Sequence, residues 1–201
     1  MDPVAHDILT FWFGTTELAS AIEKRDEWFS ATAEFDRALT EKFSGVHGQA
    51  AGGALDRLIH APEGCLALII ALDQFPRNLF RGTARAFATD AHAREAARHA
   101  VTRGYDRGFS RWPWTFVYLP FEHSEALADQ ETALELYRGL GDEESMKYAI
   151  DHHDVIRRFG RFPHRNAALG RENTPEETEY LKNPPSWGKT AAERAAQDNA
   201  S

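Results

Sequence analysis

The residues best suited to bind an anion form an arginine-rich segment in the last quarter of the chain. The segment RRFGRFPHRNAALGR, from Arg157 to Arg171, contains five arginines and one histidine but no acidic residue. A guanidinium group binds a carboxylate or a phosphate through two parallel hydrogen bonds. Pro163 stiffens the turn in the middle of the segment, so the donors that follow it are held in place. The segment therefore predicts a binding site for an anionic small molecule or a peptide carboxylate.

A shorter segment in the middle of the chain has a similar sequence. In DQFPRNLFR, from Asp73 to Arg81, an arginine and an asparagine again follow a phenylalanine-proline pair. We expect both turns to face one acidic helix, either directly or with a ligand between them. The predicted ligand-binding residues are Arg77, Asn78, Arg161, His164, Arg165 and Asn166.

The same arginines could instead pair with acidic side chains and hold helices together. The acidic residues available for such pairs are Asp73, Glu122, Glu125, Asp129 and Asp154. A cation near the carboxyl end of a helix is favourable in any protein, which favours this interpretation for Arg157 and Arg158. A ligand site and a set of internal ion pairs are therefore alternatives at this stage.

The segment FEHSEALAD offers a second kind of chemistry. Glu122, Glu125 and Asp129 recur at spacings of three and four, which predicts a shared helical face. His152 and His153 lie on the next predicted helix, and His153 is preferred because it stands four residues before Arg157 and shares a face with it. Glu122, Asp129 and His153 are the candidate residues for acid–base catalysis or for binding a divalent metal. Because no glutamate-x-x-histidine pair or two-histidine protease pattern is present, we expect no metal site.

The elements that must position these residues are helices, because no segment shows the alternation of a strand. Thr89 and Thr174 are expected to cap helices, the latter in a capping box with Glu177. Pro76 and Pro120 are expected to end the helices before them. The main predicted helices span residues 3–14, 32–51, 63–74, 89–104, 124–140 and 143–159. We therefore predict an all-α fold without a sheet, with residues 1–183 as one domain and 184–201 as a polar tail.

The composition limits the class of protein further. A chain of 201 residues is long enough for one domain with a proper core, and its net charge of -8 disfavours nucleic acid or anionic membrane as a general partner. The longest apolar run, Cys65 to Leu72, is too short to cross a membrane. It predicts a buried helix with an inert thiol at Cys65. The N-terminal segment does not begin with the basic residues of a secretory signal, so we expect a cytoplasmic protein. We also expect no nucleic-acid or membrane partner.

Four segments, in this order, resemble one known family. They are FWFG, LALIIALDQFPRNLFRGTARAFATD, YLPFEHSE with DQ after it, and IRRFGRFPHRNAALGR. Together they resemble the bacterial domain-of-unknown-function family 924 over nearly the whole chain. The resemblance implies a tetratricopeptide-repeat-like fold, in which antiparallel helices form a right-handed superhelix. It implies no activity and no catalytic residues, so the chemistry rests on this sequence alone.

Three classes of function are compatible with these residues. The first is a binding module with an arginine- and histidine-lined polar groove for an anionic small molecule or a peptide carboxylate. The second is a hydrolase-like acid–base or metal-dependent enzyme that uses Glu122, Asp129 and His153. The third is a scaffold whose polar segments only hold the helices together. We favour the first class; the sequence identifies neither a cofactor nor an oligomeric state.

Overall fold

The structure is a computed structural model that describes residues 1–185 and 187. Within this part of the chain there are helices and turns but no strand, which confirms the predicted all-α class. The α-helices are α1 (Pro3–Phe13), α2 (Ala33–Ala51), α3 (Pro62–Ile69), α4 (Phe75–Leu79), α5 (Asp90–Arg103), α6 (Arg111–Glu122), α7 (Leu127–Leu140), α8 (Glu143–Phe159) and α9 (Pro175–Tyr180). The superhelical, tetratricopeptide-repeat-like arrangement stays a prediction.

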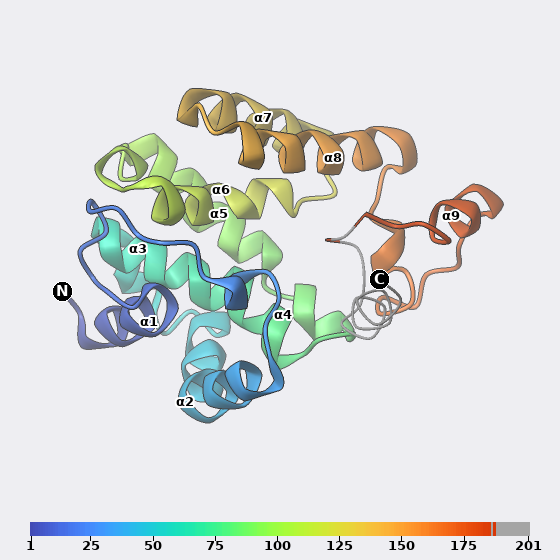
Figure 1. Ribbon diagram of the computed structural model, residues 1–201. Coiled ribbons are helices and arrows are strands. Elements are labelled where there is room, and N and C mark those ends of the chain that lie inside the picture. The colour runs from blue at the N-terminus through green and yellow to red at the C-terminus, as the bar shows by residue number, and fades with distance from the viewer. Residues whose placement is uncertain (186, 188–201) are drawn as a thin grey trace.

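The helices pack mainly against their neighbours in the chain. Helix α3 packs on α1 and α5, and α6 lies between α5 and α7. Helices α7 and α8 form a pair at the top of the molecule in Figure 1. After α8 the chain turns down toward α4, and α9 lies at that same end. This path brings the arginine-rich segment close to residues from the middle of the chain.

The core centres on α3 and the turn that follows it. Every residue from Cys65 to Phe75 is at least 90% buried, as the apolar run predicted. Cys65 is fully buried, as predicted, and burial raises the pKa of its thiol to about 12. The inertness of this thiol stays a prediction. A smaller cluster of Val155, Ile156 and Phe162 attaches the C-terminal segment to α8.

The prediction that Pro76 ends its helix is wrong. A π-helical turn, Ile70–Gln74, connects α3 to α4, and Pro76 lies in the first turn of α4. Proline has no N–H for the carbonyl of Leu72, but the hydroxyl of Thr89 donates to that oxygen at 2.5 Å. The helix therefore continues through the proline, because a distant side chain replaces the missing donor.

The other helix ends follow the sequence with three further exceptions. Thr174 forms the predicted capping box with Glu177, whereas the Thr89 hydroxyl is engaged by Leu72 and does not cap α5. Pro120 lies inside α6 instead of ending it. The next helix begins at Leu127 and not at residue 124.

Two further predictions concern membrane-spanning helices and the division of the chain into a domain and a tail. Among the described residues, no helix is long and apolar enough to cross a membrane. The predicted tail, 184–201, lies outside the described residues except for Pro184, Pro185 and Trp187. The division into a domain, 1–183, and a tail stays a prediction.

Candidate functional site

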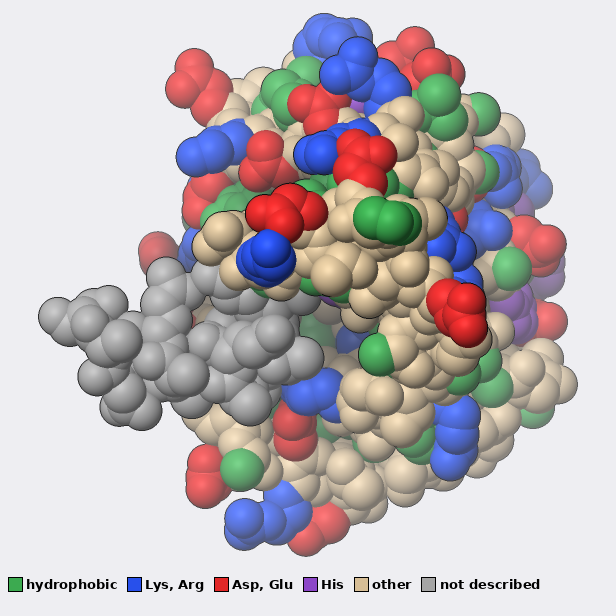
Figure 2. Space-filling model, turned by 90° about the vertical axis from the view of Figure 1, so that its right-hand side faces the viewer, with side chains coloured by type: hydrophobic (Ala, Val, Ile, Leu, Met, Phe, Trp, Pro, Cys, Tyr) green, Lys and Arg blue, Asp and Glu red, His purple; other side chains and the backbone are tan. Residues whose placement is uncertain are grey.

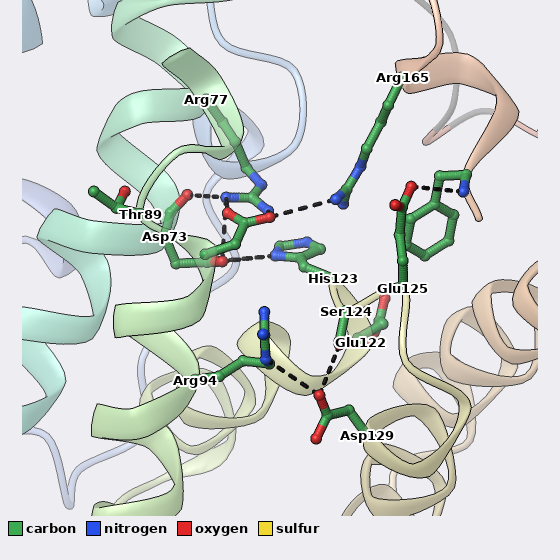
Figure 3. Close-up of polar contacts among 12 residues, drawn as sticks. Asp73, Arg77, Thr89, Arg94, Glu122, His123, Ser124, Glu125, Asp129 and Arg165 are labelled. Carbon is green, nitrogen blue, oxygen red and sulfur yellow. Dashed lines mark hydrogen bonds and ion pairs between the residues drawn. The ribbon is translucent and has the colours of Figure 1, made fainter. Parts of the chain in front are cut away.

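The two arginine-bearing turns meet at an aspartate that sequence reasoning did not select. Arg77 of α4 donates to both oxygens of Asp90, with Nη1–Oδ1 at 2.9 Å and Nη2–Oδ2 at 3.1 Å. Arg165 donates from Nη1 to Oδ2 of the same carboxylate at 3.3 Å (Figure 3). Asp90 is the first residue of α5, and Arg165 ends the 3-10 turn Pro163–Arg165 that follows α8. Arg77 and Arg165, which are far apart in the sequence, therefore share one carboxylate.

The guanidinium group of Arg165 is held in place but has few hydrogen bonds. Its carbon lies 4.6 Å from the ring centroid of Phe87 and 4.6 Å from that of Phe162. The residue is 6% exposed, yet among the described residues its Nε and Nη2 have no hydrogen-bond partner. Burial and the positive charge of Arg77 lower the pKa of Arg165 to about 10. Arg165 thus presents two donors without an acceptor among the described residues, and of these Nε is buried.

A histidine and an aspartate form a close pair beside the two arginines. Nδ1 of His123 lies 2.9 Å from Oδ1 and 3.0 Å from Oδ2 of Asp73, as Figure 3 shows. Gln74 also donates to the Asp73 carboxylate at 2.6 Å, and Nη1 of Arg77 forms an ion pair with it at 3.2 Å. Burial alone would raise the pKa of Asp73, but the charges of Arg77 and His123 lower it. The carboxylate is therefore ionised at neutral pH.

These five residues, Asp73, Arg77, Asp90, His123 and Arg165, are called the polar cluster below. The π-helical turn places Asp73 and Arg77 on the same side of the α3–α4 helix, where Arg77 also donates to the Asp73 carbonyl. Such turns are often found at functional sites. His123 directly follows the last residue of α6, and its side chain is 16% exposed. The cluster therefore combines residues from four separate parts of the chain.

A second buried pair lies next to the polar cluster. Oε1 of Glu122 is 3.1 Å from Nδ1 of His152, and both residues are buried. Burial raises the pKa of Glu122 to about 8, and the negative charges of Asp73 and Asp151 act in the same direction. Burial also holds the pKa of His152 well below its usual value. At neutral pH this pair is mainly a protonated carboxyl and a neutral imidazole.

The indole ring of Trp187 covers one side of His152. The two rings stack with centroids 3.7 Å apart, and Trp187 also meets Phe162 and His164 edge to face. Nδ1 of His164 is buried and has no hydrogen-bond partner among the described residues. Burial and the charge of Arg165 lower the pKa of His164 to about 3, so its ring is neutral.

Three of the predicted ligand-binding residues have partners elsewhere. Asn78 donates to Asp36 at 2.8 Å. Arg161 makes a bidentate ion pair with Glu177, and Asn166 donates to Asn173 at 2.8 Å and to Glu177 at 3.3 Å. For these residues the contacts are the internal ones that the alternative interpretation described. Only Arg77 and Arg165 lie in the polar cluster.

The expected acidic face does not exist, because α6 ends at Glu122 and α7 begins only at Leu127. Asp129 receives hydrogen bonds from Ser124 and Arg98, and its carboxylate also lies 3.2 Å from Arg94. Glu125 has its own partners, which are Arg171 and the backbone N–H of Phe162. These carboxylates therefore point to different partners.

The preference for His153 over His152 is also wrong, because the two histidines face different partners. His153 lies 3.4 Å from exposed Asp154, whereas His152 is the histidine that faces Glu122. The candidate catalytic residues Glu122, Asp129 and His153 thus have separate partners. Among the described residues, no group of three or more histidine, cysteine, aspartate or glutamate side chains could hold a metal ion.

The sequence analysis missed Asp90, Phe87 and the pairing of Asp73 with His123. Asp90 directly follows the predicted cap Thr89, and Phe87 lies three residues before Asp90. Both belong to ARAFATD, a stretch in which an aromatic and an acid follow the FPRN turn closely. That proximity to Arg77 is the one signal that could have suggested them.

One side of the molecule has a hollow in its surface. Figure 2 shows the hollow beside the residues drawn in grey, with lysine or arginine side chains at it. Two pockets of about 250 and 360 Å³ lie elsewhere, one beside Arg57 and Gly64 and the other beside Lys24 and Trp112. Neither of them contains a residue of the polar cluster.

Comparisons with known proteins agree with this fold. A solved structure of a protein of unknown function from Agrobacterium tumefaciens is 42% identical to the chain, with a TM-score of 0.82. The similarity covers 90% of this chain and 98% of that one. No curated protein matches the sequence. Residues 8–185 match the family described as "Bacterial protein of unknown function (DUF924)", and the chain belongs to that family.

Proposed function

We propose that the protein binds a small anion, or the carboxylate of a peptide, at the Nε–Nη2 edge of Arg165. The observation that carries this proposal is the buried Nε of Arg165, which has no hydrogen-bond partner among the described residues. Buried polar groups are almost always hydrogen-bonded, and an unpaired donor on a charged group is costly. A ligand oxygen at this edge would supply the missing acceptor.

Arg161, on the same turn, shows how such an edge is normally filled. Its Nε donates to one oxygen of Glu177 at 2.6 Å and its Nη2 to the other at 2.8 Å. Arg111 holds Asp142 through the same two nitrogens. Arg165 presents the same pair of donors without a described carboxylate. The geometry that the chain uses twice for its own carboxylates is thus available at Arg165 for one from outside.

Burial disfavours the charged form of Arg165, which an anionic ligand would stabilise. Burial and the nearby charge of Arg77 lower the pKa of Arg165 to about 10, against the opposite effect of Asp90, Glu125 and Asp73. A bound carboxylate would counter that effect. Phe87 and Phe162 flank the guanidinium group and keep it rigid, which reduces the entropy lost when a ligand binds.

A thermal-shift experiment with acetate, succinate, citrate and inorganic phosphate, at ionic strength matched with chloride, tests the proposal. A ligand that binds only the folded state raises stability by roughly 2.7 kcal/mol at 100 times its Kd. For a domain of this size that corresponds to a rise of about 5 to 10 °C in Tm. We expect at least one carboxylate to raise Tm in the wild type and in Arg161→Met, but not in Arg165→Met. Equal responses in all three proteins would refute the proposal.

A further inference from the structure

The pair formed by Asp73 and His123 has the geometry of an oriented base. Asp73 is fully buried and ionised, so its carboxylate can only accept hydrogen bonds. The contact at 2.9 Å therefore requires the proton of a neutral His123 ring to lie on Nδ1. The lone pair of Nε2 is then available, and Nε2 has no hydrogen-bond partner among the described residues. Asp73 fixes both the tautomer and the direction of this nitrogen.

The surroundings keep His123 neutral at physiological pH. Burial and the positive charges of Arg77 and Arg165 lower its pKa, against the opposite effect of Asp73. The titratable and charged groups that face His123 are Asp73 and Arg77 from the α3–α4 helix, His152 from α8, and His164 and Arg165 from the turn after α8. A base that is unprotonated at working pH and oriented by a carboxylate is the arrangement that proton abstraction requires.

The base lies close to the proposed anion site. The charge of Arg165 acts on the ring of His123, and Figure 3 draws that ring below the guanidinium group of Arg165. A small carboxylate bound at the Nε–Nη2 edge would therefore bring its neighbouring atoms toward His123. The chain thus places a rigid cation near an oriented base.

We propose that His123 is a catalytic base that takes a proton on Nε2 from a small carboxylate substrate held by Arg165. This inference rests on the proposed function. The bond between the proton and the substrate breaks, and its electron pair stays on the substrate. The imidazolium that forms keeps its Nδ1–H directed at Asp73, which stabilises the new positive charge as a positioning residue. The proton then returns from Nε2 to the substrate, so no other reactant is consumed.

Diethyl pyrocarbonate tests the base without knowledge of the substrate. The neutral Nε2 of a histidine attacks its carbonyl carbon and displaces an ethyl carbonate group. Mass spectrometry of peptides then gives the rate of modification at His123, with N-acetylhistidine in the same solution as the reference. For an ordinary histidine the rate falls about threefold between pH 7 and pH 6. For His123 in the wild-type protein we expect a clearly smaller fall, because burial lowers its pKa.

The variant Asp73→Asn gives a second readout. The NH2 group of its amide can donate to Nδ1 and so place the ring proton on Nε2, which removes the attacking lone pair, and we expect His123 to react at least about fivefold more slowly at pH 7. Dichroism would show whether this variant is folded. A native His123 that does not react, or that follows the pH dependence of N-acetylhistidine, would overturn the proposal, and this test needs only the wild-type protein.

Succinate separates this inference from the proposed function. If both hold, succinate protects His123 in the wild type and not in Arg165→Met. If a carboxylate raises Tm through Arg165 but His123 is unreactive, the anion site stands and the catalytic role is overturned. If His123 reacts as expected but no anion raises Tm or protects it, the proposed function has failed and the inference that rests on it is overturned as well.

Discussion

Arg161 and Arg165 lie four residues apart, but within the described part of the chain only Arg161 has a carboxylate on the edge formed by its Nε and Nη2. That carboxylate is Glu177, which is 2% exposed, and Arg161 donates to both of its oxygens. Arg165 is more deeply buried than Arg161, yet among the described residues it has a single hydrogen bond, to Asp90. This difference separates a structural ion pair from a candidate ligand site within one turn.

Substituting these two arginines should therefore affect stability differently. Arg161→Met leaves buried Glu177 without its main partner, and we expect a clear loss of stability. In Arg165→Met, Asp90 keeps its two hydrogen bonds from Arg77 and the methionine keeps part of the packing between Phe87 and Phe162. We expect a change within about 1 kcal/mol. Urea unfolding measures both, and a larger loss for Arg165→Met would contradict the assignment.

The protonated state of Glu122 predicts a stability that depends on pH. The folded pKa is raised to about 8, above the usual value, so the folded state binds the proton more tightly than the unfolded state. This contribution is complete below the unfolded pKa and is lost as the pH rises toward 8. Relative to the wild type, Glu122→Gln should gain about 1.4 kcal/mol per pH unit at most over this window. A difference that does not change with pH would show that Glu122 is ionised in the folded protein.

His164 should contribute to instability in acid. Its folded pKa is lowered to about 3, so the unfolded state takes up a proton first as the pH falls below the usual histidine value of about 6.5. The contribution of the neutral His164 to the stability of the protein is therefore complete above that value. It is lost as the pH falls to about 3. In His164→Gln the unfolding free energy should fall less steeply as the pH drops. The change in slope against pH should correspond to at most about one proton. An unchanged slope would contradict the neutral, buried ring.

The bond from Thr89 to Leu72 predicts a coupling with Pro76. In Thr89→Val the carbonyl of Leu72 loses its donor, which should cost roughly 1 to 2 kcal/mol. In Pro76→Ala the new backbone N–H can donate to that carbonyl, so the valine substitution should cost less in this background. A double-mutant cycle in urea measures the difference. Equal costs in the two backgrounds would show that the hydroxyl does not replace the missing N–H.

The helices were largely predictable because their signals are local. Gly14, Gly104, Gly141 and Gly160 all have positive φ at helix ends, where a residue without a side chain is favoured. Pro76 misled the prediction because the compensating hydroxyl of Thr89 comes from another part of the chain. Proline stops a helix only when nothing else satisfies the freed carbonyl.

The candidate site was predictable only in part. The arginine-rich segment and the FPRN turn pointed to Arg77 and Arg165, because clustered guanidinium groups stand out in an acidic chain. Their shared partner, Asp90, depends on how α8, α4 and α5 pack, and no spacing in the sequence encodes that contact. The choice between His152 and His153 likewise depends on which side of α8 is buried.

The most direct test of the central claim is the ¹H–¹⁵N spectrum of the arginine Nε–H groups during a titration with succinate. Comparison with spectra of Arg165→Met and Arg161→Met assigns the two signals. A carboxylate at the Nε–Nη2 edge of Arg165 predicts that its Nε–H signal moves and saturates, while the signal of Arg161, already bonded to Glu177, stays in place. If neither succinate, acetate, citrate nor phosphate moves the Arg165 signal, or if both signals move equally, Arg165 does not bind an anion.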